Sequence, residues 1–171
     1  MDSVEADALL EPQVAYYRAV APEYDEGVQH DRTELDRPEL VAELERFAPA
    51  GDVLELAGGT GCWTVELAKH ARRLTVVDAS PETLSINRAK TASVTPPVDV
   101  VANLFDWRPP RRYDVVFFSF WLTHVPPAGF DRCWRLVDRS LRPPGECSSS
   151  TTPGRGCGRP TTWRATTPTG A

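Results

Sequence analysis

The sequence predicts an α/β fold built on a doubly wound parallel sheet, and three observations carry this prediction. Short apolar segments alternate strictly with longer segments of helical periodicity, which is the pattern of parallel strands joined by helical crossovers. The apolar segments are almost continuous, as strands covered on both faces should be. A glycine-rich turn, residues 58–61, directly follows the first of them.

The N-terminal part is expected to be helical. Residues 4–20 place apolar side chains at helical spacing, with Pro12 as a kink or boundary. A second helix is predicted to start at Asp36, which caps the first turn, and Pro38 suits that turn. Residues 49–51 would end this helix. Its buried stripe would consist of Leu40, Leu44 and Phe47.

Strands and helices should then alternate along the chain. The strands are expected at residues 53–57, 74–77, 98–102 and 113–119. The intervening and following helices are expected at residues 62–70, 80–90 and 128–141, the second of them capped by Ser80. The inner face of the last helix would consist of Phe130, Trp134, Leu136, Val137 and Leu141.

Composition excludes several classes of protein. The chain has 171 residues, 41% of them hydrophobic, and a formal net charge of −5. No basic stripe is visible in the sequence of the predicted fold, which argues against nucleic acid as an obligate partner. Residues 115–122, the most apolar run, are too few to span a membrane, and the acidic N-terminus does not resemble a signal peptide, so we expect a cytoplasmic location. The four cysteines and three histidines lack metal-ligand spacing, and no pattern indicates an oligomeric state.

The pattern changes abruptly after Pro143. Residues 144–171 contain no Val, Leu, Ile or Phe, so they offer little apolar surface to offset the entropy of ordering them. One interpretation is a natural flexible tail. Back-translation of residues 145–152 with G/C-rich codons offers a sharper one, since the same bases read one position earlier encode Gly-Arg-Val-Phe-Phe-Val-Asp-Asp, a turn and an apolar strand.

We therefore expect the chain to divide into two parts at this point. Residues 1–143 would form an incomplete domain, and residues 144–171 would be a disordered, out-of-frame tail. No strand should then lie beside residues 113–119, which would be left as an apolar sheet edge.

The segment VLELAGGTGCWT, residues 53–64, carries a family resemblance. Together with YYRAVAPEYD (16–25) and VVDASPE (76–82), it resembles the class I S-adenosylmethionine-dependent methyltransferases, most closely small bacterial members related to quinone-biosynthesis methyltransferases. The resemblance covers about residues 12–143. It implies a Rossmann-like sheet of strand order 3-2-1-4-5-7-6, here with the C-terminal strands missing. It also implies S-adenosylmethionine as the cofactor and a small-molecule methyl acceptor.

The resemblance also assigns a cofactor site. Glycines let the backbone turn at a strand end and approach a ligand closely. The loop residues implied to hold the methionine portion are Ala57, Gly58, Gly59, Thr60 and Gly61, with Glu55 organising the loop. Asp78, followed by Ala79, would accept the ribose hydroxyls, since a carboxylate forms strong bonds with two hydroxyl donors. The alternative for Asp78 is a helix-capping role.

Further contacts are implied on both sides of this loop. Asn103, Leu104 and Phe105 fall where relatives place an acidic and an apolar residue beside adenine, and Asn103 lacks the usual charge. In the N-terminal segment, Arg18 would hold the methionine carboxylate, and the tyrosines Tyr17 and Tyr24 would pack near the sulfonium. An ordinary amphipathic helix with a surface arginine is an equally weighted alternative.

The acceptor side is expected after the fourth strand. Ser119, Phe120, Trp121 and His124 follow that strand, and His124 is the candidate catalytic base. A purely structural histidine is the alternative. Two other functions stay open: a nicotinamide-binding oxidoreductase, which would need a glycine where Thr64 stands, and a non-catalytic methyltransferase remnant.

Overall fold

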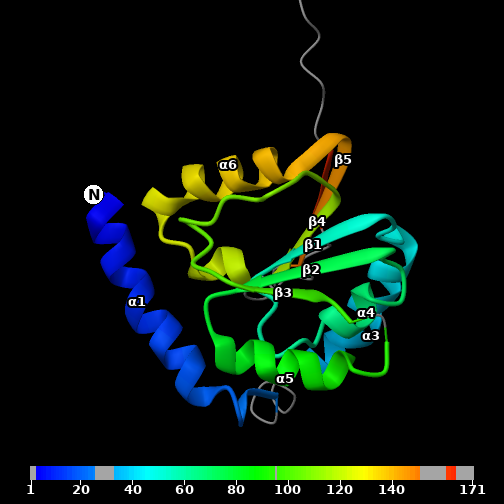
Figure 1. Ribbon diagram of the computed structural model, residues 1–171, viewed down its shortest axis with the longest axis horizontal. Coiled ribbons are helices and arrows are strands. Elements are labelled where there is room, and N and C mark those ends of the chain that lie inside the picture. Colours follow the sequence, from blue (N-terminus) through cyan, green and yellow to red (C-terminus); the bar gives the residue numbers. More distant parts are fainter. Residues whose placement is uncertain (1–2, 26–32, 95, 151–160, 165–171) are drawn as a thin grey trace, which may run out of the picture.

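A computed structural model describes residues 3–25, 33–94, 96–150 and 161–164 (Figure 1). The first half contains α1 (Ser3–Val20), α3 (Thr33–Phe47), β1 (Asp52–Leu56), α4 (Thr64–Leu67), β2 (Arg73–Asp78) and α5 (Pro81–Thr91). The second half contains β3 (Val98–Val101), β4 (Tyr113–Ser119), the 3₁₀ turns η1 (Trp121–His124) and η2 (Pro127–Gly129), α6 (Phe130–Ser140), β5 (Leu141–Ser150) and β6 (Thr161–Arg164).

The strands form one sheet in the order β3-β2-β1-β4-β5-β6. All neighbours pair in parallel except β5 and β6, which are antiparallel. β1 lies inside the sheet, between β2 and β4, and its five residues are all buried. The predicted α/β class and the Rossmann-like order of the first four strands are therefore confirmed, and the strand bounds agree with the prediction to within one residue.

Helices cover both faces of the sheet. In Figure 1, α6 lies on one side and α3, α4 and α5 lie on the other. Each face has its own apolar core: Leu54, Leu56 and Phe118 face the α6 side, whereas Val53 and Phe117 belong to the opposite cluster. Neighbouring residues of one strand alternate between the two cores because side chains along a strand point to opposite faces.

The N-terminal helix α1 stands apart from these two layers. It runs alongside one end of the sheet, between α5 and the segment that leads into α6 (Figure 1). The helix continues through Pro12, so this proline is no boundary. α3 begins at Thr33 instead of the predicted Asp36, which places Pro38 inside the helix.

The prediction that no strand lies beside β4 is wrong. β5 pairs in parallel with β4, with Val116 opposite Cys147 and Phe118 opposite Ser149, and the register shifts between Tyr113 and Val115. Sheet pairing uses backbone N–H and C=O groups, so it does not require aliphatic side chains, whereas the prediction was based on side-chain burial alone. Residues 151–160 and 165–171 of the predicted tail lie outside the described residues.

Two helices differ from the prediction in extent or orientation. α4 has four residues instead of nine, since two of the bonds that follow it, Lys69 N–H to Glu66 O and His70 N–H to Leu67 O, are of the tighter 3₁₀ type. In α6, Phe130 and Trp134 are 37% and 40% exposed, contrary to the predicted inner face. The side chains of α6 that are buried are Cys133, Leu136, Val137 and Ser140, one face to which Phe130 and Trp134 lie adjacent.

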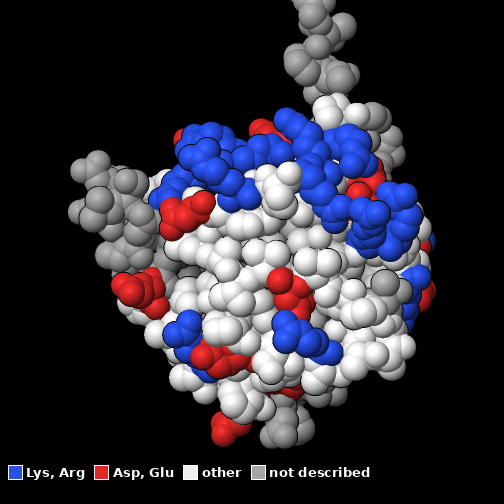
Figure 2. All heavy atoms as spheres, in the orientation of Figure 1, with Lys and Arg blue, Asp and Glu red and all other residues white. Residues whose placement is uncertain are grey.

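Arginines from distant segments gather at one end of the molecule. Figure 2 shows Lys and Arg side chains in a band over the end where α6 and β5 lie. Arg72, Arg111 and Arg142 all lie within 4.0 Å of Asp52, which is buried. The expectation that the fold has no basic stripe is wrong, because the folded chain brings together arginines that are scattered in the sequence.

The described residues contain neither a membrane-spanning helix nor a cluster of metal-ligating side chains. No helix in the described ranges is long and apolar enough to cross a membrane. In the same part of the chain, no three His, Cys, Asp or Glu side chains are grouped so that they could hold a metal ion.

The pairing of β5 with β4 generates a stability prediction. Replacing the four residues opposite Val116–Ser119 by the apolar residues of the alternative frame (Cys147→Val, Ser148→Phe, Ser149→Phe, Ser150→Val) should raise the free energy of unfolding in urea by several kcal/mol, since burying each such side chain contributes about 1.5–3 kcal/mol. The matched control Ser148→Thr/Ser149→Thr adds strand propensity with little apolar area and should gain less than 1 kcal/mol. Equal stability of the two variants would contradict the burial argument.

Candidate functional site

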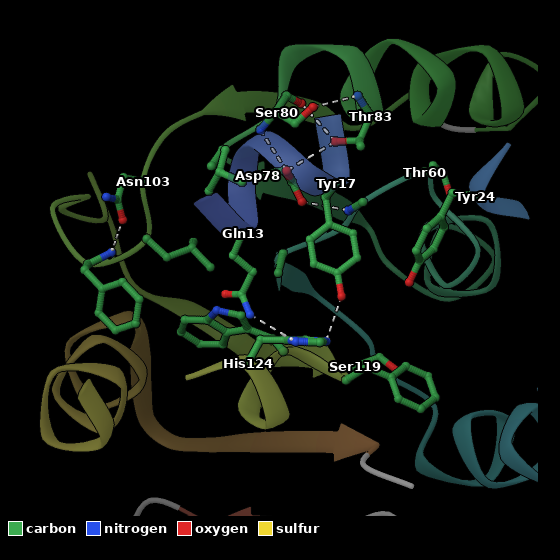
Figure 3. A pocket seen from close by; sticks show the side chains of 18 residues that line it. Gln13, Tyr17, Tyr24, Thr60, Asp78, Ser80, Thr83, Asn103, Ser119 and His124 are labelled. Carbon is green, nitrogen blue, oxygen red and sulfur yellow. Dashed lines mark hydrogen bonds between the residues drawn. The ribbon is translucent and has the colours of Figure 1, made fainter. Parts of the chain in front are cut away.

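A pocket opens where the carboxyl ends of β1, β2 and β4 meet α1 (Figure 3). It contains about 930 Å³ of empty space, part of which is open to solvent. In doubly wound sheets, ligands bind at this edge.

Most of the predicted site residues line this pocket. They are Tyr17, Tyr24, Ala57, Gly59, Thr60, Asp78, Ala79, Asn103, Leu104, Phe105, Ser119 and His124. Glu55, Gly58, Gly61 and Arg18 do not line it. Sequence reasoning missed Gln13, Val14, Ser80 and Thr83 as lining residues. The helical spacing of Gln13 and Tyr17, four residues apart on one face of α1, was the available signal for Gln13.

The glycine loop between β1 and α4 forms the floor of the pocket. Gly61 has φ +90°, and a Cβ there would lie 2.8 Å from Cγ of Asn87, so both conformation and space require glycine. At Gly59, φ is +53° and a Cβ would meet no atom within 4 Å, because this residue faces open space. The loop is therefore tightly packed beneath and accessible above, as a ligand-binding turn should be.

Asp78 fixes the position of this loop. Its Oδ2 accepts the Gly59 N–H at 2.9 Å, and its Oδ1 accepts the Ser80 N–H at 2.9 Å and the Thr83 hydroxyl at 3.2 Å. Ser80 caps α5, as predicted, and its Oγ accepts the Thr83 N–H at 3.1 Å. Two carboxylate oxygens offer about four acceptor positions, so Asp78 retains capacity for a hydroxyl donor in the pocket.

Glu55 lies under the loop and is 2% exposed. Its Oε2 accepts the Thr64 hydroxyl at 2.6 Å, and Thr64 in turn accepts from Nδ2 of Asn87 at 2.8 Å. Burial raises the pKa of Glu55 to about 8; the Thr64 bond opposes this shift and the charge of Asp78 adds to it. The side chain is thus a neutral carboxylic acid at neutral pH, and it supports the loop from inside the core.

The segment after α1 is bound to the other side of the loop. Asp25 accepts the Thr60 hydroxyl at 2.7 Å and the Cys62 thiol at 3.4 Å, and it forms an ion pair with Lys90 of α5. Burial opposes a low pKa at Asp25, but the hydrogen bonds from Lys90 and Thr60 outweigh it, so the pKa lies below its usual value. Asp25 therefore joins the N-terminal segment, the glycine loop and α5 by charge-assisted bonds.

His124 lies across the pocket from the loop and contacts α1. Its Nδ1 is 3.2 Å from Nε2 of Gln13, and its Nε2 is 3.0 Å from the Tyr17 hydroxyl, as the dashed lines in Figure 3 show. Burial lowers the pKa of His124, so the imidazole is neutral at neutral pH. The ring of Tyr17 packs edge-on against those of His124 and Tyr24, with centroid distances of 5.4 and 5.8 Å.

Asn103 lies at one end of the pocket in Figure 3, and Phe105 also lines the pocket. Oδ1 of Asn103 accepts the Phe105 N–H at 3.0 Å, a local turn that uses the oxygen expected to face adenine. The Phe105 ring packs near Trp121, at 5.9 Å between centroids, and the Arg132 guanidinium lies 5.2 Å from its centre. This end of the pocket is therefore a rigid apolar surface with one amide at its rim.

Arg18 is the predicted site residue whose position differs most from expectation. Its Nε forms an ion pair with Glu82 of α5 at 2.9 Å, and its side chain is 48% exposed. The arginine thus connects α1 to α5 at the surface, which matches the alternative of a surface arginine on an amphipathic helix.

Comparison with known proteins identifies relatives of this chain. Residues 53–145 match the family described as Methyltransferase domain. An uncharacterized methyltransferase of Staphylococcus carnosus (strain TM300) is 31% identical over 136 residues, which are 76% of this chain and 63% of that protein. The chain therefore spans less than two thirds of the length of this curated relative.

Solved structures show the same fold. The DhpI-SAM-HEP complex is 38% identical with a TM-score of 0.74, over 86% of this chain and 68% of that one. The DhpI-SAH complex is 38% identical with a TM-score of 0.72, over 82% of this chain and 68% of that one. The N-methyltransferase NodS from Bradyrhizobium japonicum WM9, in complex with S-adenosyl-l-homocysteine, is 19% identical with a TM-score of 0.61, over 70% of this chain and 62% of that one, and shares the fold.

The buried Glu55 generates a prediction for the pH dependence of stability. A carboxyl whose pKa is raised by folding stabilises the fold fully below its unfolded value, here 4.5, and this contribution is lost as the pH rises toward the folded value of about 8. The free energy of unfolding should therefore fall across this window, by at most about 1.4 kcal/mol per pH unit from this group. Glu55→Gln should flatten the profile measured by urea denaturation. The exposed control Glu45→Gln should leave it unchanged, and equal slopes in all three proteins would show that Glu55 ionises freely.

Proposed function

Since this chain belongs to the methyltransferase-domain family, we propose that it binds S-adenosylmethionine and transfers the methyl group to a small-molecule acceptor. The observation that carries the proposal is the pocket at the ends of β1 and β2, where Gly59 faces open space and Asp78 presents a carboxylate. The relatives whose names include SAM or SAH, at 38% identity, support the same ligand.

The residues of the pocket fit the three portions of such a cofactor, namely the ribose, the methionine and the adenine. Asp78 would accept the ribose hydroxyls, because it keeps acceptor capacity beyond its bonds to the loop. The backbone at Ala57, Gly59 and Thr60 would hold the methionine portion. The adenine would lie at the end formed by Asn103 to Phe105, with Ala79 beside it.

When bound, S-adenosylmethionine supplies a methyl group on a sulfonium, which an acceptor N, O or C atom can take by direct displacement. The protein contributes mainly proximity and orientation. Tyr17, Ser119 and His124 line the pocket, and the acceptor would lie beside them. Tyr17 and Tyr24 would border the sulfonium with aromatic faces, which favour a cation.

The two alternative functions differ from the proposed one in ligand or in catalysis. Family membership and the buried Thr64, which stands where a nicotinamide-binding loop needs its third glycine, argue against the oxidoreductase. A non-catalytic remnant would bind the cofactor product without transferring a methyl group, so a binding assay and a transfer assay with labelled S-adenosylmethionine separate it from the enzyme.

Asp78 provides the main test of cofactor binding. We expect S-adenosylhomocysteine to bind the full chain in titration calorimetry, and Asp78→Ala to weaken binding by about a hundredfold, since two charge-assisted bonds are lost. Asp78→Asn, which keeps one acceptor oxygen, should lie between the two.

The matched control is Asp106→Ala, which removes an exposed carboxylate paired with Arg132 and should leave affinity unchanged. Thermal melting of each variant separates loss of the contact from loosening of the loop that Asp78 supports. Tight binding of NADH, or unchanged affinity in Asp78→Ala, would contradict the proposed site.

Asn103 provides a second test at the adenine end. In Asn103→Asp, one carboxylate oxygen can keep the bond to the Phe105 N–H while the other carries charge toward the adenine amino group. Affinity for S-adenosylhomocysteine should rise about fivefold, equivalent to about 1 kcal/mol, and Asn103→Ala should lower it. Weaker binding by Asn103→Asp would place the adenine contact elsewhere.

A further inference from the structure

The direction of the hydrogen bonds around His124 determines what this residue can do. Gln13 and Tyr17 lie four residues apart on α1, and each contacts one ring nitrogen of His124. Both nitrogens are therefore engaged by α1, so neither is available to take a proton directly from a molecule in the pocket. This arrangement conflicts with the expectation that His124 itself is a general base.

The Gln13 contact sets the tautomer of His124. The atom of Gln13 that faces Nδ1 is Nε2, at 3.2 Å, and an amide nitrogen can only donate. With the Gln13 amide in this orientation, Nδ1 is the acceptor and is therefore the unprotonated nitrogen. A neutral imidazole then carries its proton on Nε2, which donates to the Tyr17 oxygen at 3.0 Å.

The Tyr17 hydroxyl completes a chain of donors. Its oxygen accepts from His124, so its own hydrogen remains available for a bond on the pocket side, which Tyr17 lines. Burial, with a smaller contribution from Tyr16, raises the pKa of Tyr17, so this group stays a phenol. Bonds that run in one direction polarise one another, which strengthens the terminal donor.

We propose that Gln13, His124 and Tyr17 form a one-way donor chain that presents the Tyr17 hydroxyl hydrogen to an oxygen of the methyl acceptor. Tyr17 is then the group that touches the acceptor, and His124 is a positioning residue that acts through it. The inference rests on the proposed methyl transfer. It favours acceptors whose oxygen is anionic, because such an oxygen accepts a strong hydrogen bond and attacks a methyl group without a base.

The tautomer of His124 is the first test. In the full chain labelled with nitrogen-15 histidine, the signals of His124 are those absent from His124→Gln, and only three histidines contribute. At neutral pH we expect the proton on Nε2, with and without S-adenosylhomocysteine. Gln13→Glu places a carboxylate, which can only accept, beside Nδ1 and should move the proton to Nδ1. The shape-matched control Gln13→Leu should give a mixture of tautomers.

The second test detects the donor itself. We would add p-nitrophenolate, an anionic oxygen whose absorption shifts when it accepts a hydrogen bond, to the protein with S-adenosylhomocysteine. We expect a shift with the natural chain, no shift with Tyr17→Phe, and a reduced shift with Gln13→Glu, in which Tyr17 donates to His124 instead.

Several outcomes would overturn the inference. They are a proton on Nδ1 or an imidazolium in the natural chain at neutral pH, and identical probe spectra for the natural chain and Tyr17→Phe. S-adenosylhomocysteine binding by the natural chain is measured separately. Binding with the wrong tautomer refutes the donor chain alone, whereas absence of binding refutes the proposed function.

Discussion

The position of the pocket depends on the pairing of β1 with a parallel neighbour on each edge. β1 is buried along its whole length and satisfies its backbone groups through β2 on one side and β4 on the other. Because all three strands run in the same direction, their carboxyl ends meet at one edge. The glycine loop, Asp78 and Ser119 are brought together there although Ser119 lies 61 positions after Gly58 in the sequence.

The N-terminal segment closes this edge through polar contacts. It is attached at three places around the pocket: Tyr17 at His124, Arg18 at Glu82, and Asp25 at the glycine loop and Lys90. Among these, Arg18 and Glu82 are about half exposed, so their ion pair contributes little to stability. The contacts of Tyr17 and Asp25 are better shielded, and Tyr17 itself lines the pocket.

Much of the fold could be predicted from sequence because burial on both faces leaves a continuous apolar run. This signal located β1, β2 and β4, and Ser80 located the start of α5. β5 was missed because its pairing depends on backbone groups, for which side-chain composition gives no signal. The gathering of Arg72, Arg111 and Arg142 around Asp52 depends on tertiary structure, which no local pattern encodes.

The site was predictable where a motif fixes the backbone. It was less predictable where a long side chain can form bonds with more than one group. The glycine loop follows from strand–turn–helix geometry, and the family resemblance pointed to Asp78. Arg18 was expected either to hold the methionine carboxylate or to lie on the surface of the helix. The structure pairs it with Glu82. Gln13 entered the pocket only because α1 continues through Pro12, which the sequence suggested as a boundary.

The contacts of α1 have a consequence for how the chain is made. Gln13 and Tyr17 bond to a histidine that lies 111 and 107 residues later, so on the ribosome this helix emerges long before its partner exists. Contacts of such long sequence separation close large loops and form late in folding. The sheet can therefore assemble with an open edge, and docking of the first helix would be the step that converts a folded core into a chain with a binding pocket.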